Sequence, residues 1–546
     1  MYFDNKIWIG NSGDEKVYIY PSMANRHGLI AGATGTGKTI TLKVLAESFS
    51  DAGVPVFFAD VKGDLAGMCA PGVDSADMQE RIRRFGLDQA GFRFTSYPTT
   101  FWDLYAKGGM PLRTTISEMG PLLLARILDL NDTQTDLLAV VFKIADDNNL
   151  LLIDTKDLKA MLNYVADNAK EYASEYGNIA RASVNAIIRA IVALETEGAD
   201  QFFGEPALSI SDWFTMNGTD KGSIQVLDCR ELIHKPNMYA TFLLWLMCEL
   251  MESLPEVGDG AKPRMVFFFD EAHLLFSGTS KTLLAKIEQV VKLIRSKGVG
   301  IYFVTQSPKD VPDGVLAQLG NKIQHALHAY TPAEQKAVRA AADSFRENPE
   351  FKTYDAITEL AVGEALVSVL DESGVPTIVQ RVKILPPQSK MGTIDDSLRD
   401  SQIRSNLLYS RYNDYYDRES AYEFLTRQGL EAESATAQAV SEPAAAQAAN
   451  APAAPAPQAP AASSASASGL TGLSAQAAAK KKKPDRDSME YKVNAAAKSV
   501  AKTTAGTVGR EVGKSLGAVG GKFGKTLGGN VGASLGRNIM GLFFKN

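Results

Sequence analysis

The sequence has few of the residues that build metal centres and disulfide frameworks. Its 546 residues include only three cysteines, Cys69, Cys229 and Cys248, and five histidines. The cysteines lie far apart and form no CxxC pair, which argues against a zinc site and a disulfide scaffold and fits a reducing cytosol. There is no HExxH pattern, and the spacing supports no Ser–His–Asp arrangement.

Long apolar runs are also missing. The first residues, MYFDNKIWIG, lack a basic region followed by an apolar run, so we expect no signal peptide. The most apolar stretch, YATFLLWLMCELMESL from Tyr239, is short and interrupted by Glu249. It predicts a buried helix rather than a transmembrane segment, and together these features predict a cytoplasmic protein.

Charge is distributed unevenly along the chain. The net charge is −6, yet the segment from Lys480 to the end holds fourteen Lys and Arg against four Asp and Glu. That segment therefore carries +10, and the rest of the chain carries −16. A basic end on an acidic body predicts an appendage that meets nucleic acid, an anionic membrane or another acidic surface.

Strand-like and helix-like segments alternate over most of the chain. The predicted strands are HGLIAG at His27, VPVFFAD at Val54, SIQVLDC at Ser223, MVFFFD at Met265, VGIYFVT at Val299 and EALVSVL at Glu364. Several are nearly continuous apolar runs, as expected for parallel strands that are buried on both faces. The alternation predicts an α/β fold with a wound, parallel-rich sheet.

Composition divides the chain into four parts. Residues 1–390 form the predicted α/β domain, with a helical insertion at about 111–205 that serves either as a packing lid or in gating and partner contact. Residues 391–432 are polar and aromatic and predict a helical extension. Residues 433–479 form an Ala/Pro-rich linker that cannot bury a core, so we expect it to be disordered, and 480–546 form a basic, Gly-rich tail.

One motif predicts a nucleotide site. The full pattern G-x-x-x-x-G-K-[ST] follows an apolar strand and precedes a helix, and its residues are Gly32, Ala33, Thr34, Gly35, Thr36, Gly37, Lys38 and Thr39. Glycines let backbone N–H groups close around phosphate oxygens, and the helix N-terminus adds positive potential. We expect Lys38 to reach the β- and γ-phosphates of ATP and the Thr39 hydroxyl to ligate Mg²⁺.

A second motif predicts hydrolysis. In RMVFFFDEAHLLF, a run of five apolar residues is followed by Asp270 and Glu271. An acidic residue at the end of a strand holds the Mg²⁺ shell, which suits Asp270. Glu271 would then lie near the γ-phosphate and activate the attacking water. A kinase needs no such base, so this pair favours an ATPase.

Two further strand ends carry polar residues. Thr305 and Gln306 end the strand VGIYFVT, where Gln306 could sense the γ-phosphate or orient water. Asp60 ends VPVFFAD, and Lys62 and Asp64 follow it. These three residues either touch water, metal or a neighbouring subunit or form a solvated turn.

The remaining histidines predict no metal site. His325 and His328 in IQHALHAY have no third ligand nearby, so we interpret them as structural. His273, which follows Asp270 and Glu271 closely, is interpreted as a packing or relay residue.

The tail shows a regular pattern. From Gly509 its glycines fall mostly four apart with apolar residues beside them, and lysines are interleaved. Such a stripe lets helices approach closely, but glycine weakens an isolated helix. We keep four alternatives open: a disordered basic tail, an anionic membrane surface contact, self-association, and DNA phosphate binding.

These motifs together resemble the HerA/FtsK group of P-loop ATPases, and within it the bacterial YjgR-type branch of HerA-like proteins. The resemblance covers roughly residues 1–390 and rests on GATGTGKT, DVKGDLAG, FFGEPAL, VFFFDEAHLLF, IEQVVKLIRSKGVGIYFVTQSP and QHALHAYTPAEQKAVRAAADSFRENP. It implies a RecA-like core and a hexameric ring whose pore moves DNA. It also implies that Lys38 and Thr39 bind nucleotide and Mg²⁺, Asp270 holds the metal, Glu271 is the base and Gln306 the sensor.

The sequence departs from that family in two respects. HerA proper begins with a β-barrel domain, whereas the loop here starts at Gly32, which leaves room for only a strand pair. Ring ATPases also place an Arg of one subunit against the neighbour's γ-phosphate. The candidates for this arginine finger are Arg295, Arg339 and Lys322, which stands where related motors show Arg.

Two functions of different classes follow. The first is a Mg²⁺-dependent ATPase that forms a ring and acts as a DNA translocase or helicase-like motor. The alternative is a nucleotide-switched ATPase that acts on a protein or membrane partner through its tail.

Overall fold

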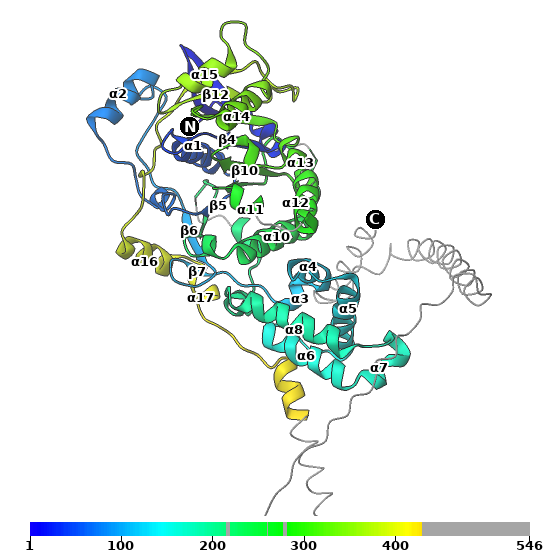
Figure 1. Ribbon diagram of the computed structural model, residues 1–546. Coiled ribbons are helices and arrows are strands. Elements are labelled where there is room, and N and C mark those ends of the chain that lie inside the picture. The colour runs from blue at the N-terminus through cyan, green and yellow to red at the C-terminus, as the bar shows by residue number, and fades with distance from the viewer. Residues whose placement is uncertain (215–218, 259, 277–280, 429–546) are drawn as a thin grey trace, which may run out of the picture. The chain divides into compact units, whose positions relative to one another are not determined.

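The computed structural model describes residues 1–214, 219–258, 260–276 and 281–428 (Figure 1). These residues belong to one compact unit, Met1–Leu430. The linker and tail predicted at 433–479 and 480–546, and the end of the extension predicted at 391–432, lie outside the described residues.

Thirteen strands of the described residues form one mixed sheet. In order across the sheet they are β1 (Tyr2–Phe3), β2 (Lys6–Ser12), β13 (Gln380–Ile384), β12 (Glu364–Ser368), β11 (Asn321–Gln324), β4 (Gly28–Ala31), β10 (Val299–Thr305), β9 (Met265–Phe269), β5 (Val56–Asp60), β8 (Ile224–Asp228), β6 (Thr99–Asp103) and β7 (Met110–Pro111), while β3 (Glu15–Ile19) pairs with β2. Neighbours from β11 to β7 are parallel, and those from β11 to β1 are antiparallel.

The six predicted strands are confirmed as β4, β5, β8, β9, β10 and β12. In the parallel part, β10 lies between β4, which carries the phosphate-loop motif, and β9, which precedes Asp270. The order β11-β4-β10-β9-β5 is that of a RecA-like core, so the predicted fold class is confirmed. The strand pair expected before the loop is β2–β3.

Both faces of the parallel part are buried, because successive strand residues point to opposite sides. On one face, Phe268 lies 6.3 Å from Phe49 of α1 (Lys38–Asp51), measured between ring centroids. On the other face, Phe57 lies 6.4 Å from Phe242 of α10 (Pro236–Ser253). Burial on both faces explains why these strands read as continuous apolar runs.

The helices predicted within 111–205 are present. Between β7 and β8 the chain forms α3 (Ile116–Met119), α4 (Pro121–Ile127), α5 (Asp132–Asp147), α6 (Thr155–Asp167), α7 (Ala169–Tyr176), α8 (Arg181–Glu195) and α9 (Ala199–Phe202). Figure 1 shows α5, α6 and α8 packed side by side. The limits of the helical insertion as a domain remain a prediction.

The other helices of the described chain surround the sheet or follow it. They are α2 (Ala76–Phe85), α11 (His273–Phe276), α12 (Lys281–Ile294), α13 (Asp313–Leu316), α14 (Pro332–Asp343), α15 (Thr353–Glu359), α16 (Asp396–Ser405) and α17 (Tyr409–Tyr412). Helix α10 is almost wholly buried, which confirms the prediction for the stretch from Tyr239. No single described helix has the length and hydropathy of a membrane span. Among the described helices only α7 and α8, taken together, reach that length and hydropathy, and they are bent by 100° relative to each other.

Candidate functional site

The loop between β4 and α1 is shaped to surround an anion. Gly37 has φ 112°, which favours glycine, and it immediately precedes α1. At Gly32 a Cβ atom would lie 2.5 Å from the Cβ atom of His325, so a side chain has no room there. The loop therefore runs directly into the N-terminus of α1, where a helix leaves backbone N–H groups without intrahelical partners, and together they form a cradle suited to an anion.

Three backbone hydrogen bonds hold the loop in place. The Gly32 N–H donates to the Thr305 carbonyl over 3.2 Å, and the Ala33 N–H donates to the Ala326 carbonyl over 2.8 Å. The Gly363 N–H donates to the Thr36 carbonyl over 3.1 Å. The loop is thus braced by the last residue of β10, by a residue that follows β11 and by the turn before β12.

The Lys38 ammonium group occupies the cradle. Its Nζ donates to the carbonyls of Gly32 over 2.6 Å and of Ala33 over 3.0 Å. Burial lowers the pKa of Lys38, and the negative charge of Glu271 opposes that shift. Thr39 follows directly in α1 and is partly exposed, as a residue that meets a ligand should be.

Asp270 and Glu271 follow the buried end of β9. Asp270 accepts a hydrogen bond from the Glu271 N–H over 2.9 Å, and burial together with the charge of Glu271 raises its pKa to about 6. Glu271 has φ 48°, a strained value for a residue other than glycine. Such strain is typical of functional sites, where surrounding structure keeps a side chain in one place.

The Glu271 carboxylate has three polar neighbours. Lys62 Nζ lies 2.6 Å from its Oε1, Gln306 Nε2 lies 3.4 Å from its Oε2, and His273 Nδ1 lies 3.4 Å from the same Oε2. Burial raises the pKa of Glu271, but its hydrogen bond and ion pair with Lys62 outweigh that effect and leave the pKa below its usual value. The carboxylate is therefore charged at neutral pH, as a base must be.

These contacts place the predicted residues as follows. Gln306 lies beside Glu271, whereas Thr305 is buried and donates to Asp310 over 2.6 Å, which gives it a role in shaping the turn. Lys62, which the sequence left between a functional and a solvated role, is the partner of Glu271.

A row of aspartates follows four adjacent parallel strands. Asp270, Asp60, Asp228 and Asp103 stand in register after or at the ends of β9, β5, β8 and β6. Burial raises the pKa of Asp60 to about 7, although its carboxylate accepts from the amides of its own turn.

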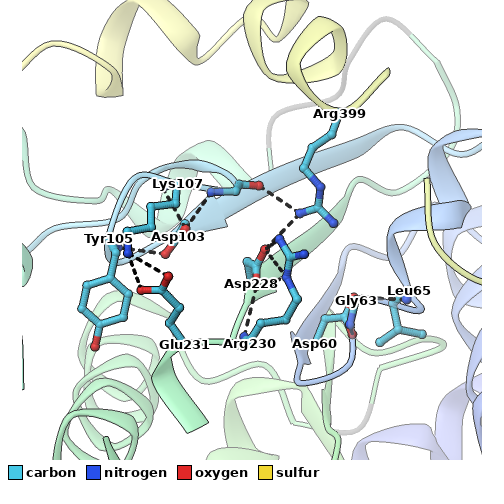
Figure 2. Close-up of polar contacts among 11 residues, drawn as sticks. Asp60, Gly63, Leu65, Asp103, Tyr105, Lys107, Asp228, Arg230, Glu231 and Arg399 are labelled. Atoms are coloured by element: carbon cyan, nitrogen blue, oxygen red, sulfur yellow. Dashed lines mark hydrogen bonds and ion pairs between the residues drawn. The ribbon is translucent and has the colours of Figure 1, made fainter. Parts of the chain in front are cut away.

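Figure 2 shows how the other two members of the row are bound. Asp103 accepts three backbone N–H bonds from the turn that follows it. Asp228 is bound by Arg230 and, over 3.1 Å, by the buried Arg399 of α16. Among the described residues, Asp270 accepts only the adjacent amide of Glu271, which leaves it the member of the row that is open to a ligand.

The residues fit a nucleotide with Mg²⁺. The glycine-rich loop leads into the N-terminus of α1, which begins with Lys38 and Thr39, and Asp270 lies near enough for its charge to act on Lys38. No group of three or more His, Cys, Asp or Glu side chains in the described part of the chain is placed to hold a metal. That is compatible with Mg²⁺ bound through one or two protein groups, since phosphates and water supply its other ligands.

The three candidates for an arginine finger lie in different places. Arg295 begins the short helix Arg295–Lys297 before β10, at the opposite end of the parallel strands from the phosphate loop. Lys322 on β11 donates to the Ser344 carbonyl over 2.9 Å. Arg339 is exposed on α14. Which of them acts on a neighbour stays a prediction.

His325 is a part of the site that the sequence did not reveal. Its ring is buried between the Thr41 hydroxyl of α1 and the Glu364 carbonyl, with distances of 2.9 Å to each. Burial lowers the pKa of His325 to about 4, so the ring is neutral. The predicted structural role is consistent with this placement, and the ring braces the phosphate loop and α1 together.

Comparison with known proteins gives one family. The model of the family described as "Helicase HerA-like C-terminal" matches residues 6–524. The chain is 22% identical over 410 residues to the DNA double-strand break repair helicase HerA of Sulfolobus acidocaldarius, covering 73% of this chain and 72% of that protein. It is 32% identical over 110 residues to a probable helicase of Methanocaldococcus jannaschii, which is about a fifth of each.

Solved structures give similarity at lower identity. The bacterial conjugative coupling protein TrwB is 14% identical with a TM-score of 0.44, and the match covers 71% of this chain and 90% of that one. VirB4 of Thermoanaerobacter pseudethanolicus is 17% identical with a TM-score of 0.43, and the match covers 70% and 96%.

Proposed function

Because the chain belongs to the helicase HerA-like C-terminal family, we propose that it is a Mg²⁺-dependent ATPase that forms a ring and moves double-stranded DNA. The observation that carries the ATPase part is the buried, charged Glu271, which follows β9. Only β10 separates β9 from β4, the strand that leads into the phosphate loop. The name of the Sulfolobus relative supports DNA as the polymer.

The loop and Lys38 bind the triphosphate. When phosphate oxygens enter the cradle, Lys38 Nζ exchanges the carbonyls of Gly32 and Ala33 for them, since an ammonium group prefers an anion to a neutral acceptor. Thr39 and Asp270 would hold Mg²⁺, which would neutralise negative charge on the phosphates when bound.

Glu271 activates water. Its carboxylate accepts a proton from the water that attacks the γ-phosphorus, while the bond from that phosphorus to the β,γ-bridging oxygen breaks and ADP leaves. Gln306, which lies beside Glu271, orients that water. Lys62 keeps the carboxylate ionised and in place before the reaction.

A ring would complete this site with a cation from the next subunit, for which Arg295, Lys322 and Arg339 are the candidates. The hexamer, the cytoplasmic location and the contacts of the basic tail belong to this proposal as well.

The test is ATP turnover of the full chain at low salt with and without double-stranded DNA, and with heparin as a polyanion control. A motor predicts that DNA raises turnover, that heparin does not, and that added salt removes the effect because phosphate contacts release counterions. Turnover that is indifferent to DNA would contradict the DNA part. It would favour the alternative, a nucleotide-switched ATPase that acts on a protein or membrane partner.

A further inference from the structure

Two aromatic rings lie exposed just after β11. Tyr330 is 83% exposed, the largest value among the exposed large hydrophobic side chains of the described residues. Its ring stacks on that of His328, with centroids 5.3 Å apart and planes 14° apart. One face of the Tyr330 ring is thus supported from within the chain, and such an arrangement presents the other face to a flat partner.

The segment that carries these rings is tied to the nucleotide site at both ends. At its start, Ala326 accepts the hydrogen bond from Ala33 of the phosphate loop. At its end, the Ala333 carbonyl accepts from Lys309 Nζ over 3.2 Å, three residues beyond Gln306. His328 is two residues beyond Ala326, so the Cα atoms of these two residues lie within about 7 Å of each other.

A second exposed apolar side chain lies beside the same loop. Val362 is 75% exposed, and the next residue, Gly363, donates its N–H to the Thr36 carbonyl of the phosphate loop. The two segments also meet each other, because the Leu327 N–H donates to the Ile357 carbonyl over 3.4 Å. Apolar side chains with high exposure therefore occur on both segments that brace the phosphate loop from the β11–β12 side.

A nucleotide whose phosphates lie in the cradle has a nucleoside that must extend beyond it. Nucleotide sites surround that part with apolar and aromatic side chains, and a base stacks on an aromatic ring through its π-face. We propose that Tyr330, backed by His328, forms the aromatic wall of the subsite for the base of a nucleoside triphosphate, with Val362 on the neighbouring segment as its second apolar residue. This inference rests on the proposed function, since it takes the triphosphate to bind at the phosphate loop.

The test separates the base from the phosphates. Calorimetry on the full chain with Mg²⁺ gives the Kd of a non-hydrolysable ATP analogue and of inorganic tripolyphosphate, which has the phosphates and no base. Tyr330→Ala should raise the Kd of the analogue about tenfold, as expected for loss of one base–aromatic stack, and leave the Kd of tripolyphosphate unchanged. Tyr330→Phe, which keeps the ring, should behave as wild type.

Tyr416→Ala is the matched control, because Tyr416 is 63% exposed and lies on the extension after α17. It should change neither Kd. The subsite is wrong if Tyr330→Ala leaves the Kd of the analogue unchanged, or if it weakens the analogue and tripolyphosphate equally. Failure of wild type to bind either ligand would instead reject the proposed function, and with it the premise of the subsite.

Discussion

Removal of the Lys62 side chain tests how Glu271 is held. In the structure Lys62 Nζ lies 2.6 Å from Glu271 Oε1, and the side chains are 42% and 7% exposed. A hydrogen bond to a charged group contributes about 1.5–3 kcal/mol. Because Lys62 is more than a third exposed, solvent screening reduces this contribution to about 1 kcal/mol.

The same free energy sets the expected rate. In Lys62→Ala, Glu271 keeps only Gln306 and His273 at 3.4 Å, so its carboxylate is held less firmly for reaction with water. A loss of about 1 kcal/mol in the transition state lowers kcat about fivefold, and steady-state Mg²⁺-ATPase assays would measure it. Lys62→Arg, which keeps the charge and the donors, should retain most of the activity.

Lys107→Ala provides the control. Lys107 pairs with Glu231 at 2.7 Å, but both side chains are at least half exposed and neither contacts Glu271. This variant should turn over ATP at the wild-type rate, because exposed pairs contribute little. If Lys62→Ala leaves kcat unchanged, the pair does not position the base, and if kcat rises, Lys62 restrains Glu271 instead. Either result would refute the reasoning.

Two further predictions concern stability. Burial lowers the pKa of His27 and of His325 to about 4 from 6.5, so below about pH 6.5 the unfolded chain binds protons that the folded chain does not. Free energies of unfolding from urea titrations should therefore fall as pH drops from about 7 to about 5. The fall should be less steep in His325→Gln, and an equal dependence on pH in this variant and wild type would contradict the prediction. Arg399→Ala should lower the free energy of unfolding by about 2 kcal/mol and lower Tm, because it removes one partner of the buried Asp228 and leaves only Arg230. Arg404→Ala, on the exposed face of α16, should leave Tm unchanged, and equal Tm values for the two variants would argue against the buried pair.

Much of the site could be predicted from the sequence, because its signals are local. The phosphate-loop motif combines glycines, Lys38 and Thr39 within eight consecutive residues, and Asp270 and Glu271 follow directly on an apolar run. A nearly continuous apolar run also identifies a strand that is buried on both faces. Strands β6, β11 and β13 were not predicted, because they are only four or five residues long and their sequences, TTFWD, NKIQ and QRVKI, contain no continuous apolar run.

The rest of the site depends on the order of the strands in the sheet, which could not be read from the residue pattern of this single sequence. Lys62 meets Glu271 across 209 residues, and His325 meets Thr41 across 284. Both contacts exist because β9 lies beside β5, and β11 beside β4. The register of Asp60 with Asp228 arises in the same way.

The measurement that tests the central claim most directly compares wild type with Glu271→Gln in two assays on the full chain. One assay measures the Kd of Mg²⁺–ATP, and the other measures ATP turnover. The account predicts that Glu271→Gln binds ATP as wild type does and loses turnover by about 100-fold or more, because the amide cannot accept the proton of the attacking water. Turnover preserved in Glu271→Gln would contradict the assignment of Glu271 as the base of an ATPase.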